Sequence, residues 1–555
     1  MNLSQIFLAS VMLLTAEPEV NRYHINYLIQ HKKIAEAINL YEKYRLDLGR
    51  HDFEILQQLG MTLLEEGARS DDPEKQLLSI FGSSIAGISS SLDILSAGIS
   101  SPRPETQIAA IHALARLQDD RSDDLLNRAM SSEYLPVRME AAYFLAARKA
   151  RTAVGQIEAL MHRLPPQMRF FFPEFFALIG TNEAILVLRG LIDDPQMHVK
   201  VEAILSTAQY QRDDLLPTIR ALLTHSHPQQ QEACCFAIGK LKDSKSLARL
   251  KQLSTSSFPH IQIAALYALY QLGDQTAQKS IEKIASLENL FAINQLGDMP
   301  GSEETLIKLL EASSEQVVLN AAVSLLRLHD PRCKDFVLSL LLRDKRDLGF
   351  EPHRSVGNSL MSWKLVPLAK QKAVEKMYDL HALSLSIREH FLVDCLELPE
   401  QDFLKIAKII FQSRQIELIP QLITLLENLG TNDAISLLQA QTNAAGAPLI
   451  RTYCSLALYR MNKTGPYEEL LKTWIRSSQN KELIRFRPIM IRQKHLEGSH
   501  YELTPEENSR LLIEAYSALA EKHEKESIDL LLEGIKSGHQ KNRYVLAGLL
   551  LHSIQ

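Results

Sequence analysis

Few residues in this sequence could do chemistry, and they form no recognisable catalytic set. His495 and His500 have a spacing at which two histidines can ligate one metal, but they lie in a break of the helical pattern, where a solvated loop is the ordinary interpretation. The phosphate-binding pattern GxxxxGK[ST] and the nucleophile pattern GxSxG are both absent. We therefore expect a protein that is not an enzyme and that needs no cofactor or metal.

The five cysteines do not indicate a disulfide framework or a metal site. Their number is odd and no CxxC pair occurs. Cys234 and Cys235 stand in a helical stretch at positions where small or aliphatic residues recur. They are best interpreted as small buried apolar residues in a reducing compartment, which favours a cytoplasmic protein.

The N-terminal segment leaves a second location open. Residues 1–16, MNLSQIFLASVMLLTA, carry no charged side chain and resemble the apolar core of a signal peptide. The segment has no Lys or Arg, and Leu14 is not the small residue expected three positions before a cut. Cleavage after Ala16 would indicate an exported assembly factor. The longest other uncharged stretch, residues 76–92, is rich in serine and too polar to cross a bilayer, so we expect no integral membrane segment and a soluble protein.

The charge balance argues against nucleic acid as the partner. The 555 residues include 61 Lys and Arg against 66 Asp and Glu, a net charge of -5. A nucleic-acid binder normally presents a strongly basic face.

The residues that must position any site belong to an internal repeat of 31 residues, which runs from about residue 92 to 275. One column of this repeat is aliphatic throughout: Leu95, Leu126, Ile157, Leu188, Ile219 and Leu250. A second column begins the next helix: Ala110, Ala141, Phe172, Ala203, Cys234 and Ala265. A fixed period of this length indicates stacked helical repeats, because one repeat alone cannot bury its apolar face. The predicted fold is all-α, an α-solenoid of stacked helix hairpins.

The best repeats carry a family resemblance. They read VRMEAAYFLAARK, IQIAALYALYQLGD and, with cysteine in place of alanine, QQEACCFAIGKLKD. This pattern resembles HEAT repeats, specifically the short type known from phycobilin lyases, over roughly residues 90–340. The resemblance implies a HEAT-like superhelix and says little about activity.

Three activities found among such proteins can be compared with the sequence. Deoxyhypusine hydroxylases hold iron through several His-Glu pairs, but this chain has one such dipeptide, His523-Glu524, and its corresponding columns hold Ala, Ile and Cys. DNA glycosylases built from HEAT-like helices need a basic cleft, which the acidic composition disfavours. A lyase-type or cofactor-handling HEAT protein remains an alternative function.

Five segments follow from these patterns. They are an N-terminal helical cap at 1–75, similar in size to a tetratricopeptide hairpin; a HEAT-like array at 76–340; an irregular insertion at 341–366; a second helical repeat segment at 367–480; and a basic break with C-terminal capping helices at 481–555. The repeat register shortens after Asp274, where the next match follows after 24 residues rather than 31. We find no convincing alternating strand pattern.

A candidate partner-binding surface follows from the repeat columns. If columns 110 and 114 are buried, columns 112 and 116 lie on the opposite side of each second helix, which by resemblance lines the concave side. These columns contain aromatic and basic residues typical of protein interfaces. The candidate partner-binding residues are His112, Arg116, Tyr143, Phe236, Lys240, Tyr267 and Gln271.

A basic stretch supplies a second candidate site. Arg485, Arg487, Arg492 and Lys494 alternate with apolar residues and could dock an acidic partner or a lipid head group. Together these patterns predict a non-catalytic scaffold or adaptor that binds a protein or peptide along its concave surface. The partner and the oligomeric state are not encoded in any of these patterns.

Overall fold

The computed structural model describes residues 21–117, 119–225, 227–342, 348–367, 380–413, 415–443, 448–483, 505–522 and 525–555. The chain divides into two compact units. Unit 1 combines the two ends of the chain, 1–145 and 435–555, and unit 2 is the continuous stretch 146–434. The predicted basic patch, His495, His500, the His523-Glu524 pair and residues 1–16 lie outside the described residues.

Almost all described secondary structure is helical. Unit 1 contains α2 (Ile34–Leu48), α3 (Phe53–Ala68), α4 (Pro73–Ala86), α5 (Leu92–Ile99), α6 (Pro104–Arg116), α7 (Asp120–Ala129), most of α8 (Leu135–Ala147) and of α25 (Asn432–Asn443), α26 (Pro448–Arg460), α27 (Tyr467–Ser478), α28 (Pro505–Ala520), α29 (Lys525–Ser537) and α30 (Asn542–Ser553). Unit 2 contains α9 (Val154–Arg163), α10 (Phe172–Ile179), α11 (Asn182–Ile192), α12 (Met197–Gln209), α13 (Leu216–His225), α14 (Pro228–Lys240), α15 (Leu247–Leu253), α16 (Pro259–Gln271), α17 (Thr276–Ala285), α18 (Leu290–Leu296), α19 (Glu303–Leu309), α20 (Glu315–Arg327), α21 (Lys334–Leu341), α22 (Leu380–Asp394), α23 (Glu400–Ser413) and α24 (Ile419–Leu429).

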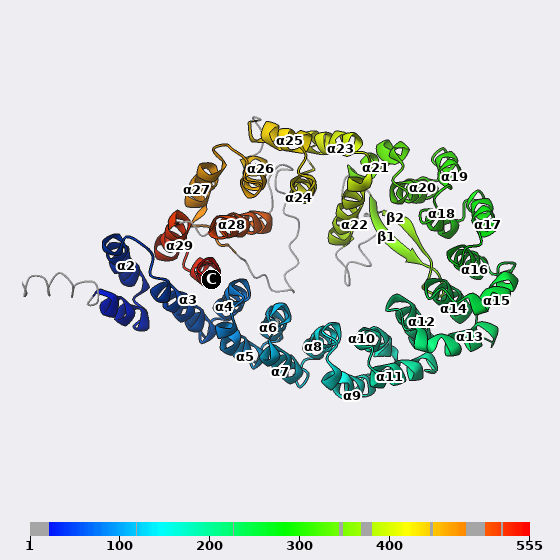
Figure 1. Cartoon of the computed structure of the whole chain (residues 1–555), viewed down its shortest axis with the longest axis horizontal. Helices are drawn as coiled ribbons and strands as arrows, with labels where there is room; N and C mark the ends of the chain where they lie inside the picture. The colour runs from blue at the N-terminus through cyan, green and yellow to red at the C-terminus, as the bar shows by residue number, and fades with distance from the viewer. Residues whose placement is uncertain are drawn as a thin grey trace, which may run out of the picture. The chain divides into compact units, whose positions relative to one another are not determined.

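The predicted period is confirmed by the helix boundaries. Second helices of successive repeats begin 31 residues apart, at Pro104, Leu135, Pro166, Met197, Pro228 and Pro259, where Pro166 opens a short 3-10 helix, η3 (Pro166–Phe171), before α10. Proline suits the first helical position because its missing N–H is not needed there. Every member of the two repeat columns, from Leu95 to Leu250 and from Ala110 to Ala265, has no exposed surface. In unit 2 the second helices line the inner side of a curved row and the first helices its outer side (Figure 1).

Two departures from the period have local causes. The second helix of the third repeat is split into η3 and α10 around Pro173, which occupies the first turn of α10. The shortened register after Asp274 coincides with α18, which has 7 residues where the neighbouring second helices α16 and α20 have 13. The predicted slip therefore corresponds to a truncated second helix.

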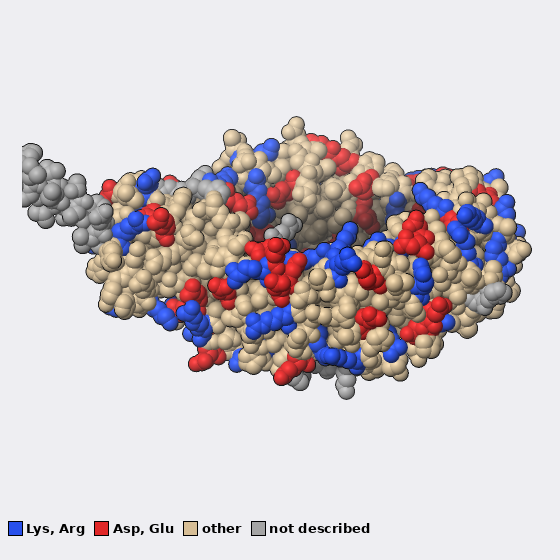
Figure 2. Space-filling view, turned by 60° about the horizontal axis from the view of Figure 1, so that its bottom comes forward, with Lys and Arg blue, Asp and Glu red and all other residues tan. Residues whose placement is uncertain are grey.

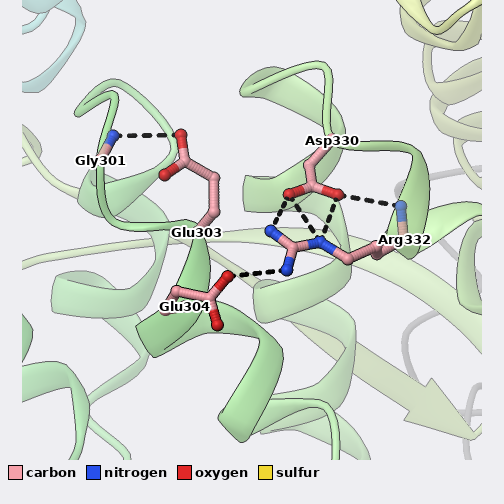
Figure 3. Close-up of polar contacts among 5 residues, drawn as sticks. All are labelled: Gly301, Glu303, Glu304, Asp330 and Arg332. Carbon is pink, nitrogen blue, oxygen red and sulfur yellow. Dashed lines mark hydrogen bonds and ion pairs between the residues drawn. The ribbon is translucent and has the colours of Figure 1, made fainter.

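Aspartates in the turns that follow second helices accept hydrogen bonds from arginines of neighbouring segments. Asp330 accepts from the backbone N–H of Arg332 and from its guanidinium, and the same guanidinium reaches Glu304 at 2.7 Å (Figure 3). Asp243 accepts two guanidinium bonds from Arg220, both of 2.8 Å. In each case the arginine bond lowers the pKa of the aspartate, so the carboxylate stays ionised and bound.

The two ends of the chain pack together within unit 1. Helix α30, drawn in red, lies against α3 and α4, drawn in blue (Figure 1). Gly548 of α30 and Gly82 of α4 meet so closely that a Cβ on either would overlap the backbone of the other helix. Ion pairs also join the N-terminal and C-terminal helices of unit 1: Lys536–Glu42 at 3.0 Å and Arg45–Asp529 at 2.9 Å between α29 and α2, Arg543–Glu66 at 2.7 Å between α30 and α3, and Lys541–Glu74.

The expectation of an irregular insertion at 341–366 without strands is corrected by the structure. Residues 348–367 form an antiparallel hairpin of β1 (Leu348–Arg354) and β2 (Met361–Pro367), with Leu348 opposite Pro367 and Arg354 opposite Met361. The hairpin packs against α18, α20 and α22 of unit 2 (Figure 1). Pro352 is compatible with this hairpin because it stands opposite Trp363 at a pair of positions that exchange no backbone hydrogen bond. The Trp363 N–H donates to Asn320 instead.

One buried arginine connects the helix that precedes the hairpin to the repeat that follows it. Arg388 of α22 is 2% exposed, and its Nε donates to the Leu341 carbonyl at the end of α21 at 2.9 Å. Its terminal nitrogens reach Gln415 at 2.9 Å and Glu417 at 3.2 Å. One guanidinium therefore caps the helix before the insertion and binds the repeat after it.

The distribution of surface charges and the hydropathy of the described helices agree with the expectations from the sequence composition. Basic and acidic side chains are interspersed over the face drawn in Figure 2. None of the helices in the described part of the chain is long and apolar enough to cross a membrane.

Candidate polypeptide-binding surface

A buried polar site in unit 2 holds the hairpin turn on α14, and we call it the hairpin seat. Glu232, which has no exposed surface, accepts from the Ser359 hydroxyl at 2.6 Å, the Gly357 backbone N–H at 2.9 Å and the Ser355 hydroxyl. A Cβ on Gly357 would collide with the backbone of α14 and the Glu232 side chain, so the turn approaches this closely only with glycine. The carboxylate is thus a buried anchor whose acceptors are all taken by the hairpin.

Two asparagines of the repeat helices hold the backbone of β2. The Asn320 side chain of α20 accepts from the Trp363 N–H at 2.7 Å and donates to the Trp363 carbonyl at 2.8 Å. The Asn294 side chain of α18 donates to the Met361 carbonyl at 2.8 Å. An amide side chain that pairs with both groups of one residue reproduces a β-ladder, so α18 and α20 bind β2 as a neighbouring strand would.

Aromatic contacts fix the hairpin on either side. The Trp363 ring meets Phe391 of α22 edge to face, with centroids 5.3 Å apart. His353 of β1 stacks on Phe291 of α18 at 5.2 Å. Burial, followed by the charge of Lys364, lowers the pKa of His353, so its ring is neutral at pH 7.

Carboxylates continue beyond the hairpin turn along the second helices. Glu202 of α12 accepts from the Asn358 side chain at 3.5 Å. Burial and the nearby charge of Glu174 of α10 raise the pKa of Glu202, and Arg354 of β1 opposes this shift. The carboxylates of Glu202 and Glu174 therefore favour cationic or hydrogen-bond-donating groups beside the hairpin turn.

The predicted aromatic and basic columns fall into two units that are described separately. In unit 1, Tyr143 is 41% exposed, and its ring and that of His112 both contact Phe144 edge to face. His112 also lies 3.5 Å from Glu140, and Arg116 is exposed. These three predicted residues therefore lie on accessible surface of α6 and α8.

In unit 2 the predicted columns are only partly accessible. Lys240 is exposed, with its ammonium 5.8 Å from the centroid of the half-buried Phe236 ring, and Gln271 is half-buried. Tyr267 is 5% exposed and donates to Asp298 at 2.9 Å, and burial raises its pKa. We therefore remove Tyr267 from the candidate surface, because its hydroxyl links successive repeats.

Sequence reasoning missed the seat residues, although one signal was present. Glu232 stands in a repeat column that is otherwise apolar: Ile108, Met139, Phe170, Val201 and Ile263. A charged residue in such a column must be paired when it is buried. No group of three or more His, Cys, Asp or Glu among the described residues could hold a metal ion. The five cysteines are free and buried.

Comparison with known proteins agrees with this architecture. The family model for HEAT repeats matches residues 216–290, which span α13 to α17 and the first residue of α18, and the chain therefore contains HEAT repeats. No curated protein matches the chain in sequence.

Three solved structures show the level of structural likeness. The complex of CpcE and CpcF of phycocyanin lyase from Nostoc is 19% identical, with 38% of this chain and 92% of that chain covered and a TM-score of 0.30. Human deoxyhypusine hydroxylase is 17% identical, with coverages of 43% and 96% and a TM-score of 0.21. A mutant of the protein Kap121p is 9% identical, with coverages of 95% and 76% and a TM-score of 0.35. Likeness at this level carries no functional inference.

Proposed function

We propose that the protein is a non-catalytic HEAT-repeat scaffold that binds a protein or peptide partner along the face formed by its second helices. The observation that carries this proposal is the hairpin seat, where this face holds the extended strand β2 through Asn294 and Asn320 and the hairpin turn through Glu232. A surface that binds main-chain groups of a strand in this way is suited to polypeptide recognition.

The exposed residues on the second helices of unit 1 offer a separate candidate binding surface. Tyr143, His112 and Arg116 offer an aromatic ring, an imidazole and a cation on accessible surface, the residue types that dominate binding energy at interfaces. The five free, buried thiols support a reducing compartment such as the cytoplasm.

The proposal is tested by affinity capture from the native host with the full chain. The variant His112→Ala/Arg116→Ala/Tyr143→Ala is compared with Leu186→Ala, which removes a 63% exposed side chain from the first helix α11. We expect a stoichiometric polypeptide partner that is lost in the triple variant and kept in Leu186→Ala, with unchanged helicity and Tm in both. Loss from both variants, or from neither, would contradict this placement of the binding face.

A further inference from the structure

The hairpin covers a surface of the repeats that lies far from its own position in the sequence. It leaves the array after α21 and returns at α22, yet its turn sits on α14, which is more than 100 residues earlier in the chain. The repeats on both sides close without it, because Arg388 joins α21 directly to the repeat that begins at Gln415. The hairpin is therefore an addition laid on the inner face of unit 2.

The contacts that hold it are directed mainly to backbone groups. Asn320 binds the N–H and C=O of Trp363, and Asn294 binds the C=O of Met361. These groups exist in any extended polypeptide, so the two asparagines would bind another strand on the same path equally well. Side-chain specificity at the seat comes from the Trp363 ring against Phe391 and from the donors that reach Glu232.

The outer side of the hairpin is not buried. Val356 at the turn is 55% exposed, and Pro352, Arg354 and Asn358 are also exposed. Because few elements cover the hairpin, detaching it exposes much less surface than unfolding the repeats below it. The register pairs the first and last strand residues, Leu348 and Pro367, so the two strands form one continuous hairpin.

We propose that the hairpin is an internal competitor that covers a binding site for an extended polypeptide segment on α14, α18, α20 and α22. This rests on the proposed function and adds both the site and its regulation. The partner segment carries an aromatic residue that takes the place of Trp363 against Phe391. It presents hydroxyl or backbone N–H donors to Glu232, as Ser355, Gly357 and Ser359 do in the hairpin. Near Glu202 it presents an amide donor or a cation, as Asn358 and Arg354 do.

Binding in trans tests this proposal directly. In the deletion variant, a four-residue Gly-Ser linker replaces residues 348–367, whose end residues Leu348 and Pro367 are strand partners about 5 Å apart. The probe is a fluorescent synthetic peptide with the sequence of residues 348–367, and fluorescence anisotropy measures its affinity. The matched control probe carries Trp363→Ala.

We expect the peptide to bind the deletion variant at least about 100-fold more tightly than the full chain, in which the seat is filled. Asn320→Ala or Glu232→Ala in the deletion variant should each weaken binding about tenfold or more, and the Trp363→Ala peptide should bind more weakly. A folded deletion variant that does not bind the peptide would overturn the inference. So would equal binding by the full chain, or binding that is insensitive to Asn320→Ala.

A second measurement covers the case in which the deletion variant does not fold. Native-state hydrogen exchange on the full chain should show β1 and β2 amides exchanging through local opening, faster than the amides of α14 and α20. Exchange of hairpin and helices at one common rate would make the hairpin part of the core and overturn the inference. The scaffold proposal would still stand if its partner depended on Tyr143, so the two failures are distinguishable.

Discussion

Replacing Glu232 by glutamine should loosen the hairpin while the helices of unit 2 stay intact. The native carboxylate accepts three short hydrogen bonds, from the Ser355 hydroxyl, the Gly357 N–H and the Ser359 hydroxyl, and a longer one of 3.4 Å from the Ser359 N–H. Glutamine keeps one acceptor oxygen for the two hydroxyls, but its NH2 group faces the Gly357 N–H, which is a donor, and the bonds that remain lose their charge assistance.

The magnitude follows from these bonds. Hydrogen bonds to a charged group contribute about 1 kcal/mol more than neutral ones, so three bonds lose about 3 kcal/mol. The neutral amide costs less to desolvate than the carboxylate, which offsets part of this loss. The net loss of hairpin stability is about 2 to 3 kcal/mol. That difference corresponds to a rise of about 30- to 150-fold in the opening equilibrium of the hairpin.

Hydrogen exchange with mass spectrometry measures this change peptide by peptide. Protection of residues 348–367 should fall by the stated factor in Glu232→Gln, while protection of α23 and α24 stays unchanged. The matched control is Glu105→Gln, which alters an exposed glutamate in the first turn of a second helix, α6. Unchanged hairpin protection, or an equal loss throughout unit 2, would refute the role assigned to Glu232.

Replacing Gly548 by valine should lower the stability of unit 1 by about 1–3 kcal/mol in urea denaturation, because the side chain collides with the backbone of the facing helix. Gly155→Ala, which meets no atom within 4 Å, should be neutral or stabilising, and equal losses in both variants would contradict this. Arg388→Met should destabilise unit 2 by about 3–5 kcal/mol, because it leaves buried acceptors without a donor, and a loss below about 1 kcal/mol would disprove the bridging role. Arg220 lowers the pKa of Asp243 below its ordinary value of 3.8, so this pair stabilises the fold at higher pH and the contribution is lost as pH falls from about 4 through the folded pKa. In Tm measurements from pH 6 to pH 2, Asp243→Asn should flatten the acid decline, and a slope equal to that of the wild type would contradict the argument.

The repeat array could be predicted because its signal recurs. Each 31-residue repeat places the same residue types at the same positions, so Leu95 and its equivalents identify the buried face many times over. The shortened register after Asp274 was also visible, and its cause is the truncated helix α18.

The hairpin could not be predicted from the same kind of pattern. Gly349, Pro352 and Gly357 indicate a break in a helical array, and a single hairpin supplies no second copy with which to compare it. Helix α22 contacts β1, while α18 and α20 contact β2, and the strands lack the clean alternation of a sheet with one face in water. Pro352 is tolerated only because its nitrogen points away from β2, a fact that depends on the register.

Long-range partners were also beyond the reach of one sequence. Nothing local in Gly82 or Gly548 shows that the two helices touch across more than 450 residues. For Tyr267 the repeat column suggested an exposed aromatic ring. In the structure its hydroxyl donates to Asp298 in the next repeat, which that column does not reveal. Among the residues that hold the hairpin, Glu232 is the one that the sequence could have indicated, because it is a charged residue in an otherwise apolar repeat column.

Site-specific photo-crosslinking in the native host tests the central claim most directly. A photoreactive phenylalanine analogue replaces Tyr143 on the proposed binding face or Leu186 on a first helix, in the otherwise unaltered chain. The scaffold account predicts a covalent adduct with a polypeptide partner from position 143 and none from position 186. Adducts of equal yield from both positions, or no adduct from position 143, would contradict it.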